Sequence, residues 1–175
     1  MFIFKTVVLT GAGISLSAGI PGYDMHWRGV PLRVMLTRQW ANAHPRLYRE
    51  LYQEMLTWMD KEPTKAHYAI AKAGIPVVTE NIDRLHQKAG SETVIELHGN
   101  LKQGIALLGD PIRNWEKAKD TVAAADHLLV IGCSLDVKPA GDLPSAAREQ
   151  GTQVSIINED ADQAVPAWLK RLKLT

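Results

Sequence analysis

Six short stretches of this 175-residue chain carry residues that could bind a phosphate or act as an acid or base. The first is Gly11-Ala12-Gly13-Ile14-Ser15, a glycine-rich turn that follows the apolar run from Lys5 to Leu9 and leads into a helix. Glycines let backbone N–H groups approach a phosphate, and a helix start adds the positive end of its dipole. The stretch predicts a pyrophosphate-binding loop. A glycine turn that only packs a helix against a strand has the same form, and a dehydrogenase fingerprint would place glycine where this chain has Leu16.

Small or polar residues also follow five later apolar runs. They are Glu80-Asn81-Ile82-Asp83 after residues 75–79, His98-Gly99-Asn100 after 93–97, Gly109-Asp110-Pro111 after 105–108, Gly132-Cys133-Ser134 after 127–131 and Asn158-Glu159 after 153–157. The carboxyl ends of parallel strands meet at one edge of a sheet, where doubly wound proteins bind their ligands. We therefore expect these residues, although far apart in the sequence, to surround one site.

The alternation of apolar runs with helical segments is typical of an α/β protein. We expect a three-layer, Rossmann-like, doubly wound and mostly parallel sheet of six strands in a single domain, 1–175, with a small helical insertion at about 27–60. The start, Met1 to Lys5, lacks the basic region and cleavage site of a signal peptide and is expected to be a strand. Helices are expected at residues 45–56, 64–72, 114–125, 139–150 and 165–172.

Composition excludes several kinds of partner and site. With 20 Lys and Arg against 19 Asp and Glu, the net charge of +1 gives no electrostatic footprint for nucleic acid or an anionic membrane. No apolar run approaches the roughly 20 residues that span a bilayer. The single cysteine, Cys133, excludes an intrachain disulfide and a zinc site with several thiolates from one chain. We expect a soluble, cytoplasmic protein.

Taken together, these segments resemble the sirtuins, the family of NAD-dependent protein lysine deacylases. The glycine turn with Gly19-Ile20-Pro21 resembles the family's first NAD loop, and His98-Gly99 is similar to its catalytic His-Gly pair. Thr79-Glu80-Asn81-Ile82-Asp83 resembles its Thr-Gln-Asn-Ile-Asp segment. The other matches are Gly109-Asp110-Pro111 with its Phe-Gly-Glu-Pro loop, Gly132-Cys133-Ser134-Leu135 with its Gly-Thr-Ser-Leu run, and Ile157-Asn158 with its late Ile-Asn.

The resemblance implies a role for each matching residue, with NAD as co-substrate and an acyl-lysine protein or peptide as substrate. His98 is the implied general base, assisted by Asn81 and Asp83, and a histidine suits that task because its ordinary pKa leaves it largely neutral at cellular pH. Gly109 and Asp110 are the implied substrate-binding residues. The implied NAD contacts are Gly11, Ala12, Gly13, Ser15, Tyr23, Asn81, Ile82, Asp83, Gly132, Cys133, Ser134, Asn158 and Glu159.

Three departures from the family pattern qualify this assignment. Only residues 100–104 fill the place of the zinc module with its two Cys-x-x-Cys pairs, so neither a zinc ribbon nor any other metal is expected. The first loop has Tyr23-Asp24 where the family has Phe-Arg, and the Asp24 carboxylate would repel a pyrophosphate unless Arg28 or Arg33 neutralises it. The segment after Asn158 is shorter than the family's adenine-side segment.

The resemblance favours an NAD-dependent lysine deacylase that transfers the acyl group to ADP-ribose and releases nicotinamide. Without the zinc module, one wall of the peptide groove is missing or is rebuilt from the helices between Trp27 and Asp60. Two alternatives therefore stay open on the same fold. One is an NAD glycohydrolase or ADP-ribosyltransferase, which needs no peptide clamp, and the other is a non-catalytic module that binds NAD or ADP-ribose.

Overall fold

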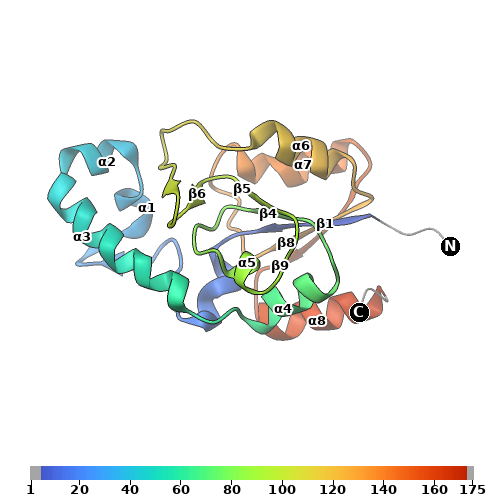
Figure 1. Ribbon diagram of the computed structural model, residues 1–175. Coiled ribbons are helices and arrows are strands. Elements are labelled where there is room, and N and C mark those ends of the chain that lie inside the picture. The colour runs from blue at the N-terminus through green and yellow to red at the C-terminus, as the bar shows by residue number, and fades with distance from the viewer. Residues whose placement is uncertain (1–4, 173–175) are drawn as a thin grey trace.

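A five-stranded parallel sheet forms the centre of the computed structural model, which describes residues 5–172 (Figure 1). The strand order is β5-β4-β1-β8-β9, so the chain winds outward from β1 in both directions and the order reverses between β1 and β8. This arrangement confirms the Rossmann-like, doubly wound fold. The strands are β1 (Thr6–Thr10), β4 (Val77–Thr79), β5 (Val94–Glu96), β8 (His127–Ile131) and β9 (Gln153–Ile157).

The expectation of a sixth strand at residues 105–108 is wrong. There β7 (Gly104–Ile105) pairs antiparallel with β6 (Gly99–Asn100), outside the main sheet. A parallel crossover needs a dozen or more residues, and the few between His98 and Ile105 suffice only for a hairpin. The run is apolar for another reason, because it lines the cavity described below. The strand expected at Met1 to Lys5 lies outside the described residues except for Lys5, which precedes β1.

Helices cover both faces of the sheet. In Figure 1, α6 (Trp115–Ala123) and α7 (Leu143–Glu149) lie on one face, and α4 (Lys65–Lys72) and α8 (Ala161–Arg171) lie on the other. Successive strand side chains point to opposite faces. Accordingly Val7 and Leu9 of β1 pack in the cluster with α6 and α7, whereas Val8 packs in the cluster with α4 and α8. All three are almost fully buried, which explains why the strand is an uninterrupted apolar run.

Local sequence signals explain several of the remaining elements. Pro45 occupies the first turn of α3, where its missing N–H costs nothing, and Thr64 caps α4 by accepting from the backbone N–H of His67. The helix expected near Ser15 begins earlier and is a 3-10 helix. The remaining elements are η1 (Ala12–Ala18), β2 (His26–Trp27), β3 (Val30–Pro31), α1 (Leu32–Met35), α2 (Arg38–Ala43), α3 (Pro45–Leu56), η2 (Thr57–Asp60), α5 (Leu85–Lys88) and η3 (Ala140–Asp142).

Residues 27–60 form an apolar cluster separate from the two that flank the sheet. Leu32, Met35, Leu51 and Met55 are its buried members from this segment, and Leu101 of the β6–β7 hairpin completes it. In Figure 1 the helices α1, α2 and α3 stand to one side of the sheet. The segment therefore packs around an apolar core of its own, beside the sheet.

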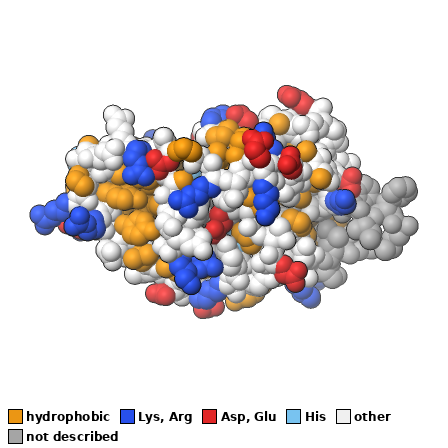
Figure 2. All heavy atoms as spheres, turned by 45° about the horizontal axis from the view of Figure 1, so that its top comes forward, with side chains coloured by type: hydrophobic (Ala, Val, Ile, Leu, Met, Phe, Trp, Pro, Cys, Tyr) orange, Lys and Arg blue, Asp and Glu red, His pale blue; other side chains and the backbone are white. Residues whose placement is uncertain are grey.

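The surface carries charges of both signs. On the face that Figure 2 shows, basic and acidic side chains are interspersed, in keeping with the net charge of +1. Within residues 5–172 no helix is long and apolar enough to cross a bilayer.

Two histidines are buried together behind the end of β1. The rings of His67 and His86 lie 4.6 Å apart, and their exposed fractions are 0% and 1%. The Nδ1 atom of His67 accepts from the N–H of Thr64 at 3.2 Å, and Nε2 of His86 lies 2.9 Å from Oγ1 of Thr10. Burial lowers the pKa of His67 to about 4 and holds the pKa of His86 well below its usual value.

This pair predicts a specific loss of stability in acid. In the unfolded chain a histidine binds a proton near pH 6.5, whereas His67 does so only near pH 4 in the folded chain. The free energy of unfolding should therefore fall as the pH drops from 6.5 toward 4, by about 1.4 kcal/mol per pH unit for His67. Urea unfolding between pH 7.5 and 5 should give a shallower dependence in His67→Gln. The exposed control His44→Gln should match the native chain, and an unaltered slope in His67→Gln contradicts this account.

Candidate functional site

Two glycine loops touch at the point where the strand order reverses. The N–H of Gly11 donates to the carbonyl of Ile131 at 3.0 Å, and the N–H of Gly13 donates to the carbonyl of Gly132 at 2.9 Å. A Cβ on Gly13 would lie 2.5 Å from the Cα of Gly132, which itself has a φ of +62°. Only glycine fits at either position, because a side chain on one would overlap the backbone of the other.

These bonds change how the first loop is interpreted. The N–H groups of Gly11 and Gly13 hold the loops together in this structure, so they do not point freely toward a ligand. The structure thus combines the two interpretations of the glycine turn, since it packs chain segments closely and also lines a cavity. Because the N–H groups of Gly11 and Gly13 are engaged, we expect the N–H of Ala12 to be the one in this turn that binds a phosphate.

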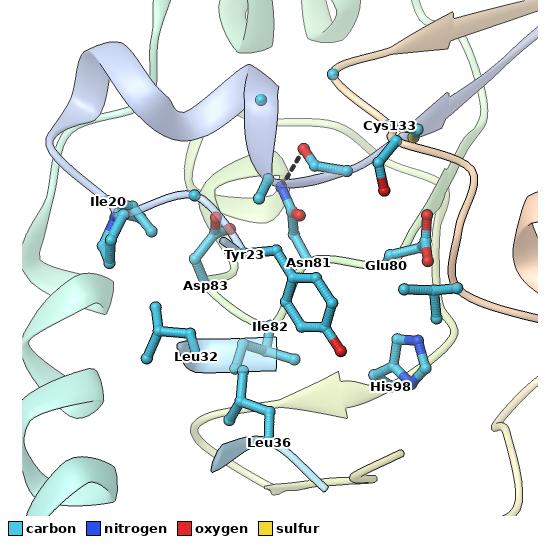
Figure 3. Close-up of a pocket in the computed structure, with 18 of the residues that line it drawn as sticks. Ile20, Tyr23, Leu32, Leu36, Glu80, Asn81, Ile82, Asp83, His98 and Cys133 are labelled. Carbon is cyan, nitrogen blue, oxygen red and sulfur yellow. Dashed lines mark hydrogen bonds between the residues drawn. The ribbon is translucent and has the colours of Figure 1, made fainter. Parts of the chain in front are cut away.

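A cavity of about 640 Å³ opens beside the glycine loops at the carboxyl edge of the sheet (Figure 3). This volume is in the range of sites that hold a cofactor or drug-sized ligand. It brings together most of the residues singled out in the sequence. Those that line it are Gly11, Ala12, Gly13, Tyr23, Asn81, Ile82, Asp83, His98, Gly132, Cys133, Ser134 and Asn158.

Four of the residues singled out do not line the cavity: Ser15, Gly109, Asp110 and Glu159. Ser15 is fully buried behind the wall. Asp110 is held by Arg38, whose Nε and Nη2 donate to its two carboxylate oxygens at 2.8 and 2.6 Å. This bidentate contact lowers the pKa of Asp110 and fixes the loop that follows the lining residues 105–108.

A hydrogen-bond network fixes Asn81 and Asp83 against the first loop. The hydroxyl of Ser15 donates to Oδ2 of Asp83 at 2.7 Å, and the backbone N–H of Leu85 donates to Oδ1 at 2.9 Å. The amide of Asn81 donates to the carbonyl of Gly11 at 3.1 Å and lies 3.3 Å from the Ser15 hydroxyl. Burial raises the pKa of Asp83, and the hydrogen bonds that its carboxylate accepts from Leu85 and Ser15 oppose the rise. The network joins the segment after β4 to the turn after β1.

His98 follows β5 and lies in the same cavity as the glycine loops. Its carbonyl accepts from the N–H of Ala106 at 2.8 Å, which anchors the backbone at the start of the β6–β7 hairpin. Burial lowers the pKa of the His98 ring, so the imidazole is neutral near pH 7. A neutral imidazole facing a cavity is able to accept a proton there.

The departures in the first loop have structural explanations. An oxygen of Asp24 lies 3.3 Å from Nη1 of Arg33, and 76% of the Asp24 side chain is exposed. The expected neutralising partner is thus Arg33, whereas Arg28 pairs with Glu50 at 2.6 Å. Tyr23 places its ring inside the cavity, as Figure 3 shows, and its buried hydroxyl has no hydrogen-bond partner among residues 5–172.

The sequence placed Glu80 near the site without giving it a role, and it did not indicate which residues form the apolar wall. Glu80 lines the cavity, and burial raises its pKa to about 7. Its signal was present, because it stands beside Asn81 where the resembled family carries glutamine. The apolar wall had no local signal, since its residues come from loops and short helices far apart in the chain. That wall includes Leu16, Ile20, Leu32, Leu36, Trp58, Ala106, Leu107 and Leu108. Within residues 5–172 no three His, Cys, Asp or Glu side chains are grouped to hold a metal ion.

The fold and this cavity define a Rossmann-like protein with a ligand site at the switch point of its sheet, and comparisons with known proteins narrow the class. A model described as the Sir2 family matches residues 11–104. NAD-dependent protein deacylase 2 of Archaeoglobus fulgidus is 33% identical over 209 aligned residues, covering 93% of this chain and 83% of the relative. NAD-dependent protein deacetylase 2 of Caldanaerobacter subterraneus is 34% identical, with coverage of 80% and 75%.

Solved structures agree with the sequence comparisons. The structure described as "Sir2-p53 peptide-NAD+" superimposes with a TM-score of 0.85 at 25% identity, covering 97% of this chain and 94% of that chain. A Sir2 homologue solved as an NAD complex gives a TM-score of 0.87 at 24% identity and supports the fold. This chain belongs to the Sir2 family.

The glycine contact gives a test of how the site is held. Gly13→Ala should destabilise the fold by about 1–3 kcal/mol, because the new Cβ lies 2.5 Å from the Gly132 backbone and the loops must part. Gly22→Ala is a matched control in the same cavity, where a new Cβ would lie 3.4 Å from the end of the Leu16 side chain. Chemical unfolding of both variants measures the difference. Equal stability of the two would show that the loops do not constrain each other.

Proposed function

We propose that this protein is an NAD-dependent protein lysine deacylase, which transfers the acyl group of a lysine to ADP-ribose with release of nicotinamide. The observation that carries the proposal is the placement of His98 and the two glycine loops on one cavity of about 640 Å³. The names of the relatives support it, since they are NAD-dependent protein deacylases and deacetylases.

The residues present fit a dinucleotide. We assign the pyrophosphate to the first loop around Ala12, and the adenosine side to Ser134 and Asn158. Asn158 is positioned by its Oδ1 atom, which accepts from the N–H of Cys133 at 3.2 Å. We assign the nicotinamide side to Ile82, Asp83 and Tyr23, which line the same cavity and supply an apolar side chain, a carboxylate fixed by two hydrogen bonds and an aromatic ring. The Tyr23 hydroxyl, which has no hydrogen-bond partner within the described part of the chain, is a donor that a ligand in this cavity can use.

When bound, NAD supplies a ribose carbon that accepts the acyl oxygen and a nicotinamide that leaves. His98 acts as the general base, and one of its ring nitrogens takes a proton from a ribose hydroxyl. Because burial lowers the pKa of His98, the ring is neutral and able to accept that proton. Asn81 and Asp83, fixed by Ser15 and Gly11, orient the groups around the scissile bond. The apolar wall excludes water, which strengthens each polar contact in the cavity and suppresses hydrolysis.

For the acyl-lysine side, we assign the peptide to the rim formed by residues 105–110. The segment 105–108 lines the cavity, and the Arg38 contact holds Asp110 and Gly109 directly beyond it. Leu32, Leu36 and Trp58 line the same cavity from the 27–60 segment, which is joined to this rim where the N–H of Leu108 donates to the carbonyl of Leu36 at 2.9 Å. We further propose a cytoplasmic location, where NAD is available, and fractionation of cells that express the protein tests it.

Incubation with NAD and an acetyl-lysine peptide tests the function. We expect nicotinamide release that depends on the peptide, and we expect His98→Ala to lower the rate by at least 100-fold because the base is lost. His26→Ala, at an exposed histidine outside the cavity, is the matched control and should keep the native rate.

The other outcomes separate the alternatives. Release of nicotinamide without peptide identifies a glycohydrolase or ADP-ribosyltransferase. Binding of NAD without turnover identifies a sensing module, and unchanged deacylation in His98→Ala removes the assigned mechanism.

A further inference from the structure

The hydroxyl of Tyr23 is a buried polar group of the cavity wall to which residues 5–172 supply no hydrogen bond. Burial, then the charges of Glu80 and Asp24, raise the pKa of Tyr23 to about 12, so the hydroxyl keeps its proton and is able to donate. A buried hydroxyl without a partner is costly, and a ligand that brings an acceptor removes that cost. The Tyr23 hydroxyl therefore indicates where a polar group of a ligand would be bound.

This hydroxyl lies on the side of the cavity where the acyl group would react. In Figure 3 the phenolic oxygen of Tyr23 points toward the His98 ring, and Glu80 lies on the same side of the cavity. The carbonyl of His98 accepts from the N–H of Ala106 at 2.8 Å, so His98 also borders the rim to which we assign the acyl-lysine. An acyl group that enters over residues 105–108 and reaches the ribose beside His98 therefore comes close to the Tyr23 hydroxyl.

Glu80 supplies a hydrogen-bond acceptor on the same side. The cavity has two other carboxyl groups, and both are engaged. Asp83 accepts from two donors, and the largely exposed Asp24 pairs with Arg33 at 3.3 Å. The side-chain partner of Glu80 is the thiol of Cys133. A carboxyl group can accept several hydrogen bonds, so Glu80 keeps capacity for a donor that a ligand brings.

We propose that this site selects an acyl group that carries a hydroxyl on its chain, as lactyl and β-hydroxybutyryl groups do. The inference rests on the proposed function, because it requires an acyl-lysine to be the substrate. The substrate hydroxyl accepts from the Tyr23 hydroxyl and donates to the Glu80 carboxyl, so one group satisfies both residues. An acyl chain without a hydroxyl places C–H groups there and leaves the Tyr23 donor unpaired.

The lining of the cavity disfavours charged substituents on the acyl chain. Asp24, Glu80 and Asp83 line it, and no lysine or arginine among residues 5–172 does, so a carboxylate on the acyl chain would be repelled. An ammonium group has only donors and cannot accept from the Tyr23 hydroxyl. A hydroxyl is neutral and both accepts and donates, which is the combination that Tyr23 and Glu80 require.

Pairs of peptides that differ by one hydroxyl test the inference. A lactyl-lysine peptide is compared with its propionyl counterpart, and a β-hydroxybutyryl-lysine peptide with its butyryl counterpart. Calorimetric titration without NAD gives the ratio of dissociation constants, and deacylation at saturating NAD gives the ratio of kcat/KM. We expect both ratios to favour the hydroxyl by about tenfold in at least one pair, because two hydrogen bonds are gained and each contributes about threefold or more.

Removal of the phenolic oxygen isolates the contribution of Tyr23. In Tyr23→Phe, which keeps the ring, we expect the preference for the hydroxyacyl peptide to fall at least threefold. Damage to the fold would weaken both peptides of a pair alike and leave their ratio unchanged. Tyr68→Phe removes the same atom from an exposed residue of α4 outside the cavity, and it should keep the native ratio.

The native chain alone can overturn the inference, whether or not Tyr23→Phe folds. It does so if neither hydroxyacyl peptide is preferred over its counterpart. A preference that Tyr23→Phe leaves unchanged overturns the inference as well. In both cases, NAD-dependent deacylation of any peptide of the set would leave the proposed function standing. If the chain deacylates none of the four peptides nor an acetyl-lysine peptide, the proposed function falls, and this inference falls with it.

Discussion

The contact between the glycine loops that follow β1 and β8 is the constraint on which the site depends. Gly13 and Gly132 approach so closely that neither position has space for a Cβ. Because the loops leave the sheet from adjacent strands, their contact sets where both chains turn away and thereby forms one end of the cavity. The two N–H···O bonds that hold the loops use backbone groups that a more open turn would offer to a ligand.

Most of the sheet could be predicted from the sequence because its strands are buried on both faces. Such strands form continuous apolar runs, as in β8, where Leu128 and Val130 pack toward one helical layer and Leu129 and Ile131 toward the other. The run at 105–108 has the same composition but a different cause. Its side chains are apolar because they line a cavity, and apolar character alone does not distinguish that from strand burial.

The polar half of the site could also be predicted, since residues at the carboxyl ends of parallel strands must converge. Asn81 and His98 line the same cavity for this reason. The sequence named the helices between Trp27 and Asp60 as one of two alternatives for a wall, but it did not predict which side chains face the cavity. Leu32, Leu36 and Trp58 reach the cavity only through the packing of the 27–60 segment on its own cluster. The raised pKa of Glu80 could not be predicted either, because its cause is burial, which is a property of the folded chain.

The polar half of the cavity comes from the ends of the strands and the apolar half comes mainly from the 27–60 segment. Contacts where the two halves meet fix their relative positions. Ile82 lines the cavity from the sheet side and also packs against the cluster of the 27–60 segment. The hydroxyl of Tyr52 in α3 donates to the carbonyl of Leu101 at 3.1 Å, and the N–H of Leu101 donates to the carbonyl of Ile82 at 3.0 Å. A continuous path thus runs from α3 through the β6–β7 hairpin to the segment that carries Asn81 and Asp83. The apolar wall is positioned by the same backbone that positions the polar groups, so a shift of one half must move the other.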